Sequence, residues 1–225
     1  MDASPTPVRD LVFLLDVDNT LLDNDAVIDD LRRHLASTFG GDCQAEYWRI
    51  FEQLRHELGY ADYLGALQRY RLEHPRDTQV LGVSLFLLHC PFTDRLYPRA
   101  LDVVARLRRR APVVILSDGD AVFQPHKVER SGLWAAVEGD VLIYIHKERM
   151  LDDVERRYPA RRYVMVDDKL SLLTAIKSVW GERVTTVFVR QGHYATDRAI
   201  LDAYPAADVT IEGIAELIDL ADSFH

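Results

Sequence analysis

The sequence predicts an α/β fold, a doubly wound parallel sheet with a small all-helical subdomain inserted after the first strand. Three observations predict it. Short, continuously apolar runs recur along the chain, stretches of helical period lie between most of them, and one long interval near the start holds only helical patterns. Continuous rather than alternating hydrophobicity is typical of strands covered on both faces, as the strands of a parallel sheet are.

The first strand is expected at Leu11–Leu15, an apolar run that ends abruptly at Asp16. Five more strands are expected at Val113–Leu116, Val141–Ile145, Tyr163–Val166, Val184–Val189 and, more weakly, Asp208–Ile211. The connecting helices are expected at Leu96–Leu107, Ala121–Arg130, Glu148–Tyr158, Leu170–Val179, Asp197–Tyr204 and Ile214–Leu220. Within the second of these helices, the pattern predicts that Lys127 is exposed to solvent.

Between about Asn24 and Arg95 the chain has no convincing strand pattern. Its helical patterns lie at Val27–Phe39, Ala45–Leu58, Tyr60–Leu72 and Val80–Leu88. An interval of this length is too long for a loop, so residues 24–95 are expected to form a helical cap over the strand ends. Residues 1–23 and 96–225 would then form the α/β core. Tyr60, Tyr63 and Tyr70 follow roughly helical spacing and are expected in the core or rim of the cap.

Composition narrows the classes of protein that the chain can belong to. The chain has 225 residues and a formal net charge of −9, which argues against a protein that binds the nucleic-acid backbone. No apolar run reaches the length of a membrane span, and Met1–Arg9 reads as a short mobile lead-in rather than a signal peptide. Two isolated cysteines indicate a reducing compartment. We therefore expect a cytoplasmic monomer or homodimer with no nucleic-acid or membrane partner.

Polar residues follow four of the expected strands, at the ends where ligands bind in open α/β sheets. These residues are Asp16 and Asp18, then Ser117 with Asp118 and Gly119, then Lys147, then Asp167 and Asp168. Taken singly, they have simpler readings as turn formers, a helix cap or a surface lysine. Together they predict acidic groups, a hydroxyl and a lysine on one rim. The only asparagines, Asn19 and Asn24, both follow the first strand, and the sequence assigns them no role.

This ordered set resembles the four motifs of the haloacid dehalogenase superfamily, in particular its phosphatase-like members with a helical cap after the first motif. The D-x-D-x-T motif is matched by Asp16 to Thr20, and the Ser or Thr motif by Ser117. The lysine motif is matched by Lys147, and the acidic pair by Asp167 and Asp168. The resemblance implies a metal-dependent hydrolase in which Asp168 is a direct metal ligand and Asp167 its supporting partner.

Physical chemistry, independently of the resemblance, also suggests roles for these residues. Asp16 and Asp18 point to the same side if the backbone stays extended, and two such charges need a cation or a proton between them. Mg²⁺ prefers oxygen ligands, and we expect it at Asp16, Asp18, Asp167 and Asp168. Phosphoryl transfer needs a nucleophile, which Asp16 suits, and an acid and base, which Asp18 suits. The residues expected to bind the phosphate are Ser117, Asp118, Gly119 and Lys147.

The expected function is therefore hydrolysis of a small phosphorylated metabolite, a phosphate monoester, with Mg²⁺ and through an aspartyl-phosphate. Three alternatives stay open: a phosphomutase with the same residues, a 2-haloacid dehalogenase, and a binding protein on the same fold. A halide leaves without a proton, so Asp18 favours phosphoryl transfer over dehalogenation. The presence of Asp16, Asp18 and Lys147 argues against a retired catalytic scaffold. Specificity is expected in the cap, whose sequence does not identify a substrate.

Overall fold

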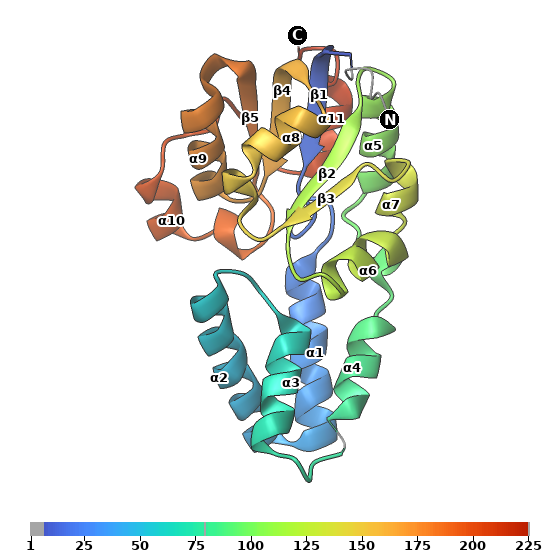
Figure 1. The fold of residues 1–225 in the computed structure, drawn as a ribbon, viewed down its shortest axis with the longest axis vertical. Coiled ribbons are helices and arrows are strands. Elements are labelled where there is room, and N and C mark those ends of the chain that lie inside the picture. Colours follow the sequence, from blue (N-terminus) through green and yellow to red (C-terminus); the bar gives the residue numbers. More distant parts are fainter. Residues whose placement is uncertain (1–6, 79, 225) are drawn as a thin grey trace, which may run out of the picture.

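The protein consists of a parallel sheet flanked by helices, with a second group of helices at one end of the sheet (Figure 1). A computed structural model describes residues 7–78 and 80–224, so most of the expected N-terminal lead-in lies outside the described residues. The sheet has six strands in the order β3-β2-β1-β4-β5-β6, and every pair is parallel. The predicted α/β fold class is confirmed.

Every predicted strand is present. Their bounds are β1 (Arg9–Leu15), β2 (Val113–Asp118), β3 (Val141–Tyr144), β4 (Ala160–Asp167), β5 (Val184–Val189) and β6 (Val209–Ile211). In β1 the five residues from Leu11 to Leu15 are all buried, as expected for a central strand covered on both faces. The chain moves outward to β2 and β3 on one side of β1 and to β4, β5 and β6 on the other. Strand order therefore reverses beside β1, which is where ligands bind in such sheets.

Two buried clusters cover the two faces of the sheet. On one face, side chains of β1 such as Phe13 and Leu15 pack with α5 (Ala100–Arg108), α7 (Leu133–Ala136) and α11 (Leu217–Leu220). On the other face, Val12 and Leu14 pack with α8 (Leu151–Arg157) and α9 (Leu170–Trp180). The remaining helices of the core are α6 (Phe123–Arg130) and α10 (Arg198–Ala203). The sequence did not predict α7, because four residues are too few to show a helical period.

Residues 24–78 and 80–95 contain helices and no strand, as predicted. The helices are α1 (Asn24–Phe39), α2 (Gly41–Leu58), α3 (Tyr63–Glu73), α4 (Leu81–Leu88) and the short η1 (Phe92–Arg95). They lie together at the end of the sheet where the strands point (Figure 1). Of the tyrosines predicted in the core or rim of this group, Tyr63 and Tyr70 are buried and Tyr60 is half-buried. We call residues 24–95 the cap; the bounds of the cap as a domain stay a prediction.

The two ends of the cap run side by side where they join the sheet. Leu22 and Leu96 form an antiparallel bridge. The Asp23 amide donates to the Arg95 carbonyl at 2.7 Å, and the Tyr97 amide donates to the Leu21 carbonyl at 2.9 Å. The neck of the cap is therefore fixed to the segment that follows β1.

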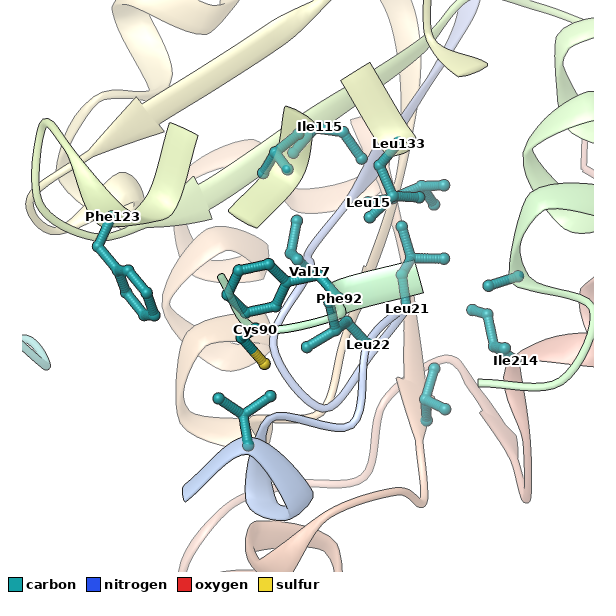
Figure 2. Close-up of a cluster of buried hydrophobic side chains, with 14 of the residues drawn as sticks. Leu15, Val17, Leu21, Leu22, Cys90, Phe92, Ile115, Phe123, Leu133 and Ile214 are labelled. Carbon is teal, nitrogen blue, oxygen red and sulfur yellow. The ribbon is translucent and has the colours of Figure 1, made fainter. Parts of the chain in front are cut away.

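Apolar side chains hold this neck in place. Leu15 at the end of β1 and Val17, Leu21 and Leu22 in the segment after it belong to one buried cluster with Phe92, and Figure 2 shows Val17 and Leu22 beside Phe92. Phe92 in turn makes an edge-to-face contact with Phe123 of α6, with ring centroids 5.8 Å apart. These side chains are almost fully buried. The segment that carries Asp16 and Asp18 therefore packs on a close-packed apolar layer rather than facing solvent.

Candidate active site

Five polar residues from four strands meet at the carboxyl edge of the sheet. They are Asp16 after β1, Ser117 within β2, Lys147 after β3, and Asp167 and Asp168 at the end of β4; all five are buried. The structure thus brings together five of the residues that the sequence predicted on one rim. Charged residues are almost never fully buried without a partner, so their contacts are informative.

The turn after β1 is fixed by Asn19. This residue has φ +58°, a left-handed conformation that asparagine tolerates better than most residues. Its side-chain oxygen accepts from the amides of Asn24 and Asp25, at 3.0 and 3.1 Å. The hydroxyl of Thr20 donates to Asp16 Oδ2 at 3.2 Å, so the same turn orients the first carboxylate.

Lys147 is the cation nearest to Asp16. Its Nζ lies 2.6 Å from Asp16 Oδ1 and also donates to the Leu116 carbonyl at 3.2 Å. It lies 2.7 Å from Asp167 Oδ2 in an ion pair whose angles fall short of a hydrogen bond. Burial alone would lower the pKa of the Lys147 ammonium, but Asp16, Asp167 and Asp118 outweigh burial and raise that pKa. Lys147 is therefore a fixed positive charge within a ring of carboxylates.

Asp16, Asp167 and Asp168 form a compact group of carboxylates. One oxygen from each lies within 4.8 Å of the others. Asp167 Oδ1 accepts from the Lys169 amide at 2.9 Å, whereas neither oxygen of Asp168 has a hydrogen-bond partner among the described residues. Burial and the neighbouring carboxylates raise the pKa of Asp168 well above its ordinary value, against the attraction of Lys169. Buried, unpartnered oxygens of this kind fit a hard divalent cation such as Mg²⁺.

Ser117, Asp118 and Gly119 line the neighbouring part of the rim. The hydroxyl of Ser117 accepts from Gln124 Nε2 at 3.0 Å and faces Asp16 Oδ1 at 3.5 Å. Asp118 Oδ1 accepts from the Lys147 amide at 2.7 Å, and burial raises the pKa of this carboxyl. Gly119 donates its amide to the Tyr144 carbonyl. A side chain on Gly119 would meet Gln124 at 2.5 Å, so Gly119 contributes space here rather than a free donor.

Asp18 lies apart from the three-carboxylate group. Its two oxygens accept from Lys127 Nζ at 2.7 and 2.9 Å, and its side chain keeps 28% of its surface exposed. The prediction that Lys127 is exposed is wrong, because its side chain is fully buried. Lys127 follows Phe123 by four residues and therefore lies on the same inward face of α6. Its ammonium is compensated there by Asp18 and by Asn24 Oδ1 at 2.9 Å.

A cavity of about 480 Å³ separates this edge of the sheet from the cap. The core contributes Asp18, Asp118, Asp168 and Lys169 to its wall, and Asn24, Arg32, Trp48, Phe51, Arg55 and Tyr60 line it from the cap. The wall thus combines carboxylates with aromatic rings and two guanidinium groups. A ligand in this cavity would reach the carboxylates on one side and the cap on the other.

Contacts across the cavity connect the cap to a short turn of the core, η4 (His193–Ala195). The His193 amide donates to Asp25 Oδ2 at 2.8 Å, and its ring Nδ1 lies 2.7 Å from Asp25 Oδ1. Arg55 of the cap donates to the hydroxyl of Tyr194. These contacts hold the cap against the core at one edge of the cavity.

Sequence reasoning missed Lys127, Lys169 and Asn24, all of which line the cavity or contact a residue that does. One signal could have found the two lysines. Only four lysines occur among the 27 basic residues, and three of the four lie at this site. Lys169 Nζ lies over the ring of Tyr194, 5.1 Å from its centroid, and the nearby carboxylates raise the pKa of Lys169 although burial opposes this.

Among the helices of the described residues, none combines the length and the apolar character that a membrane span needs.

Comparison with known proteins identifies the family to which the chain belongs. The model of the haloacid dehalogenase-like hydrolases matches residues 11–179. No curated protein matches the chain.

Several solved structures are similar to this one. A protein of Burkholderia xenovorans LB400, described as a haloacid dehalogenase-like hydrolase, is 62% identical, with a TM-score of 0.91 over 94% of this chain and 98% of that chain. The magnesium-bound HAD-hydrolase YfnB of Bacillus subtilis is 17% identical, with a TM-score of 0.62 over 95% and 99% of the two chains. The L-2-haloacid dehalogenase of Xanthobacter autotrophicus is 16% identical, with a TM-score of 0.64 over 95% and 99%. The last two show a shared fold alone.

Proposed function

Because the chain belongs to the haloacid dehalogenase-like hydrolases, we propose that it hydrolyses a small phosphate monoester through an aspartyl-phosphate on Asp16. One observation carries this choice among the reactions of the fold. Asp18 follows the nucleophile by two residues, faces the cavity, and lies outside the group of three carboxylates suited to a metal. A second carboxyl group in that position suits proton transfer to and from the substrate.

Asp16 is the nucleophile in this proposal. Lys147 and Thr20 fix its two oxygens, so the carboxylate is held in one orientation before the substrate arrives. An oxygen of Asp16 attacks phosphorus, and the bond from phosphorus to the ester oxygen breaks. Ser117 and the positive charge of Lys147 are placed to bind the oxygens of the transferring group.

Mg²⁺ fits the carboxylate group as the partner of Asp16 and Asp168. Among the described residues, neither oxygen of Asp168 has a hydrogen-bond partner, which suits a direct ligand, whereas Asp167 contacts Lys147 and the Lys169 amide, which suits a supporting role. When bound, Mg²⁺ would neutralise the negative charge that the phosphate brings to this edge of the sheet. The side chain of Asp18, expected from the sequence as a further ligand, is assigned to proton transfer instead.

In this proposal Asp18 transfers a proton in each of the two steps. In the first step the Asp18 carboxyl gives its proton to the departing ester oxygen, so that an alcohol leaves. In the second step Asp18 takes a proton from water as the water oxygen attacks phosphorus. The bond from phosphorus to Asp16 breaks, and inorganic phosphate and the free carboxylate of Asp16 result.

The proposal is tested by assaying purified protein for phosphate release from nitrophenyl phosphate and from a panel of phosphorylated metabolites. Activity should require Mg²⁺ and disappear with EDTA, and Asp16→Asn should be inactive on every ester. Halide release from 2-chloropropionate should be absent. Full activity after metal removal would contradict the role of Mg²⁺, and halide release by the wild type but not by Asp16→Asn would establish dehalogenation instead. Isomerisation of a sugar phosphate without phosphate release would identify a mutase.

A further inference from the structure

We propose that Lys127 is a positioning residue that fixes the carboxyl group of Asp18 for proton transfer, and that the cap supports it through Asn24. This inference rests on the proposed function, since it explains how the proton-transfer group is aimed. Nothing in the four motifs of the family requires a lysine on α6, and the sequence pattern placed Lys127 in solvent.

The contacts of Lys127 use its whole donor capacity. An ammonium group has three protons. The three acceptors around Lys127 Nζ are the two oxygens of Asp18, at 2.7 and 2.9 Å, and Asn24 Oδ1, at 2.9 Å. Because three acceptors hold the Lys127 ammonium at once, it cannot move with the Asp18 carboxylate if that carboxylate rotates. The position of Asp18 is thereby tied to the rigid face of α6.

Burial makes the pair between Lys127 and Asp18 obligatory. The Lys127 side chain is fully buried, and Asp18 is the one carboxylate that it contacts within ion-pair distance among the described residues. An unpaired buried ammonium is strongly unfavourable, so rotation of Asp18 toward the metal group would leave Lys127 uncompensated. Lys127 thus keeps Asp18 separate from Asp16 and Asp168, although Asp18 follows Asp16 by only two residues.

The ion pair with Lys127 leaves the Asp18 carboxyl group accessible from the cavity. The Asp18 side chain keeps 28% of its surface exposed, and it lines the cavity between cap and core. One carboxyl oxygen can stay with Lys127 while the other carries the proton to or from the substrate. Lys127 itself does not line that cavity, so it acts through Asp18 and does not touch the substrate.

The cap contributes the other half of the support. Asn24 is the first residue of α1, and its Nδ2 donates to the hydroxyl of Tyr63 in α3 at 3.4 Å. The ring of Tyr63 contacts that of Phe123 with centroids 5.5 Å apart, and Lys127 Nζ lies over the Phe123 ring at 5.3 Å. A continuous path of buried groups therefore leads from the interior of the cap to the carboxyl group of Asp18.

The test compares Lys127→Met with the wild type on two ester classes. An alkoxide needs a proton to leave, whereas nitrophenolate departs with little help. If Asp18 is no longer held in position, kcat for an alkyl phosphate should fall by about 10²-fold or more, with little change in KM. The rate of the initial nitrophenolate burst from nitrophenyl phosphate should fall much less. The matched control is Lys177→Met, a lysine of α9 that bonds Asp208 and the Val184 carbonyl outside the site. It should match the wild type.

A double-mutant cycle separates positioning from simple stabilisation. If Lys127 acts through Asp18, then Lys127→Met added to Asp18→Asn should lower turnover no further, within about twofold. Equal loss on both ester classes, or losses that multiply in the double variant, would overturn the inference. If Lys127→Met does not fold, Asn24→Ala removes one of the three acceptors and should reproduce the same dependence on the leaving group to a smaller extent. An Asn24→Ala enzyme with no such dependence would also overturn it.

A structural measurement keeps this inference distinct from the proposed function. Absence of phosphatase activity in the wild-type protein would refute the function, not the placement of Asp18. The positioning role would then be tested by comparing crystal structures of the wild type and of Lys127→Met, or of Asn24→Ala if Lys127→Met does not fold. The Asp18 carboxyl group should move from its wild-type position in the variant. An unmoved Asp18 would overturn the positioning role whatever the substrate proves to be.

Discussion

Replacing Asp168 by Asn should make the metal-free protein more stable and the magnesium-bound protein less so. Both oxygens of Asp168 are buried and lack a hydrogen-bond partner among the described residues, and burial first, then neighbouring carboxylates, raise its pKa. The folded state therefore binds a proton more tightly than the unfolded chain. Stability is lost as pH rises from the ordinary aspartate value, about 4, through the raised value. Asn carries no charge and avoids this loss.

A buried charged group without a partner costs more than a neutral one, and we take the difference as about 1 to 3 kcal/mol in the free energy of unfolding, the scale of one buried unsatisfied group. For a chain of this size, each kcal/mol shifts Tm by about 2 to 4 °C. In EDTA at neutral pH, Asp168→Asn should therefore melt about 2 to 12 °C above the wild type, with the difference shrinking toward pH 4. With Mg²⁺ at 100 times its Kd, the wild type gains about 2.7 kcal/mol. The variant, which lacks a direct ligand, should gain much less.

Thermal unfolding followed by circular dichroism, with EDTA and with Mg²⁺ at several pH values, measures both effects. The matched control is Asp167→Asn. Burial raises the pKa of Asp167 as well, but Asp167 is paired with Lys147 and accepts from the Lys169 amide. Asp167→Asn therefore loses contacts that Asp168→Asn does not, and it should melt below Asp168→Asn in EDTA. If Asp168→Asn is the less stable protein in EDTA, Asp168 has a protein partner that its geometry does not show, and its assignment as a metal ligand loses its basis.

Three further predictions concern catalysis and the cap. Lys147→Ala should lower kcat/KM by about 10²-fold or more, whereas Lys177→Ala, measured in parallel, should not; similar values would show that the third motif lies elsewhere. Asp18→Asn should give a burst of nitrophenolate near one per active site, then slow turnover, with phosphate on Asp16 after rapid acid quenching; the absence of both would make Asp18 a structural residue. Beryllofluoride with Mg²⁺ should increase hydrogen-exchange protection near Asp25 and in the cap; an unchanged pattern would contradict closure.

Hydrophobic pattern predicted the sheet well because the inner strands β1, β2 and β5 and the second half of β4 are largely buried on both faces. A run such as Leu11–Leu15 contains no polar residue that would obscure the pattern, and it ends abruptly at Asp16, at the edge of the sheet that carries the candidate site. The topology then brings Ser117, Lys147 and Asp168 to that edge without further information, because parallel strands end on the same side. Local sequence was therefore sufficient to place the candidate residues that stand at the ends of strands.

Pattern failed where a partner distant in sequence decides the environment. Lys127 lies on the inward face of α6, and a lysine within a helix ordinarily indicates solvent. Its compensating carboxylate, Asp18, is 109 residues away, and its second acceptor, Asn24, lies in the cap. No helical period contains that information. The hydrogen bond from the Gly119 amide to Tyr144 likewise depends on the pairing of two strands, which the local sequence does not show.

The paired ends of the cap have a consequence for how this protein can change. Because the Asp23 amide bonds the Arg95 carbonyl and Leu22 bridges Leu96, the sheet meets the inserted segment as a closed loop whose two ends are already together. The entropy of closing such a loop grows only with the logarithm of its length, so its size can vary at little cost to the rest of the fold. Residues between these ends can be lengthened, shortened or exchanged in evolution or by engineering while the strand ends keep their geometry, provided that Asn24 and Tyr63, which connect the cap to Lys127, are kept. The part of the cap that faces the cavity and the carboxylates at the strand ends can therefore change at separate rates.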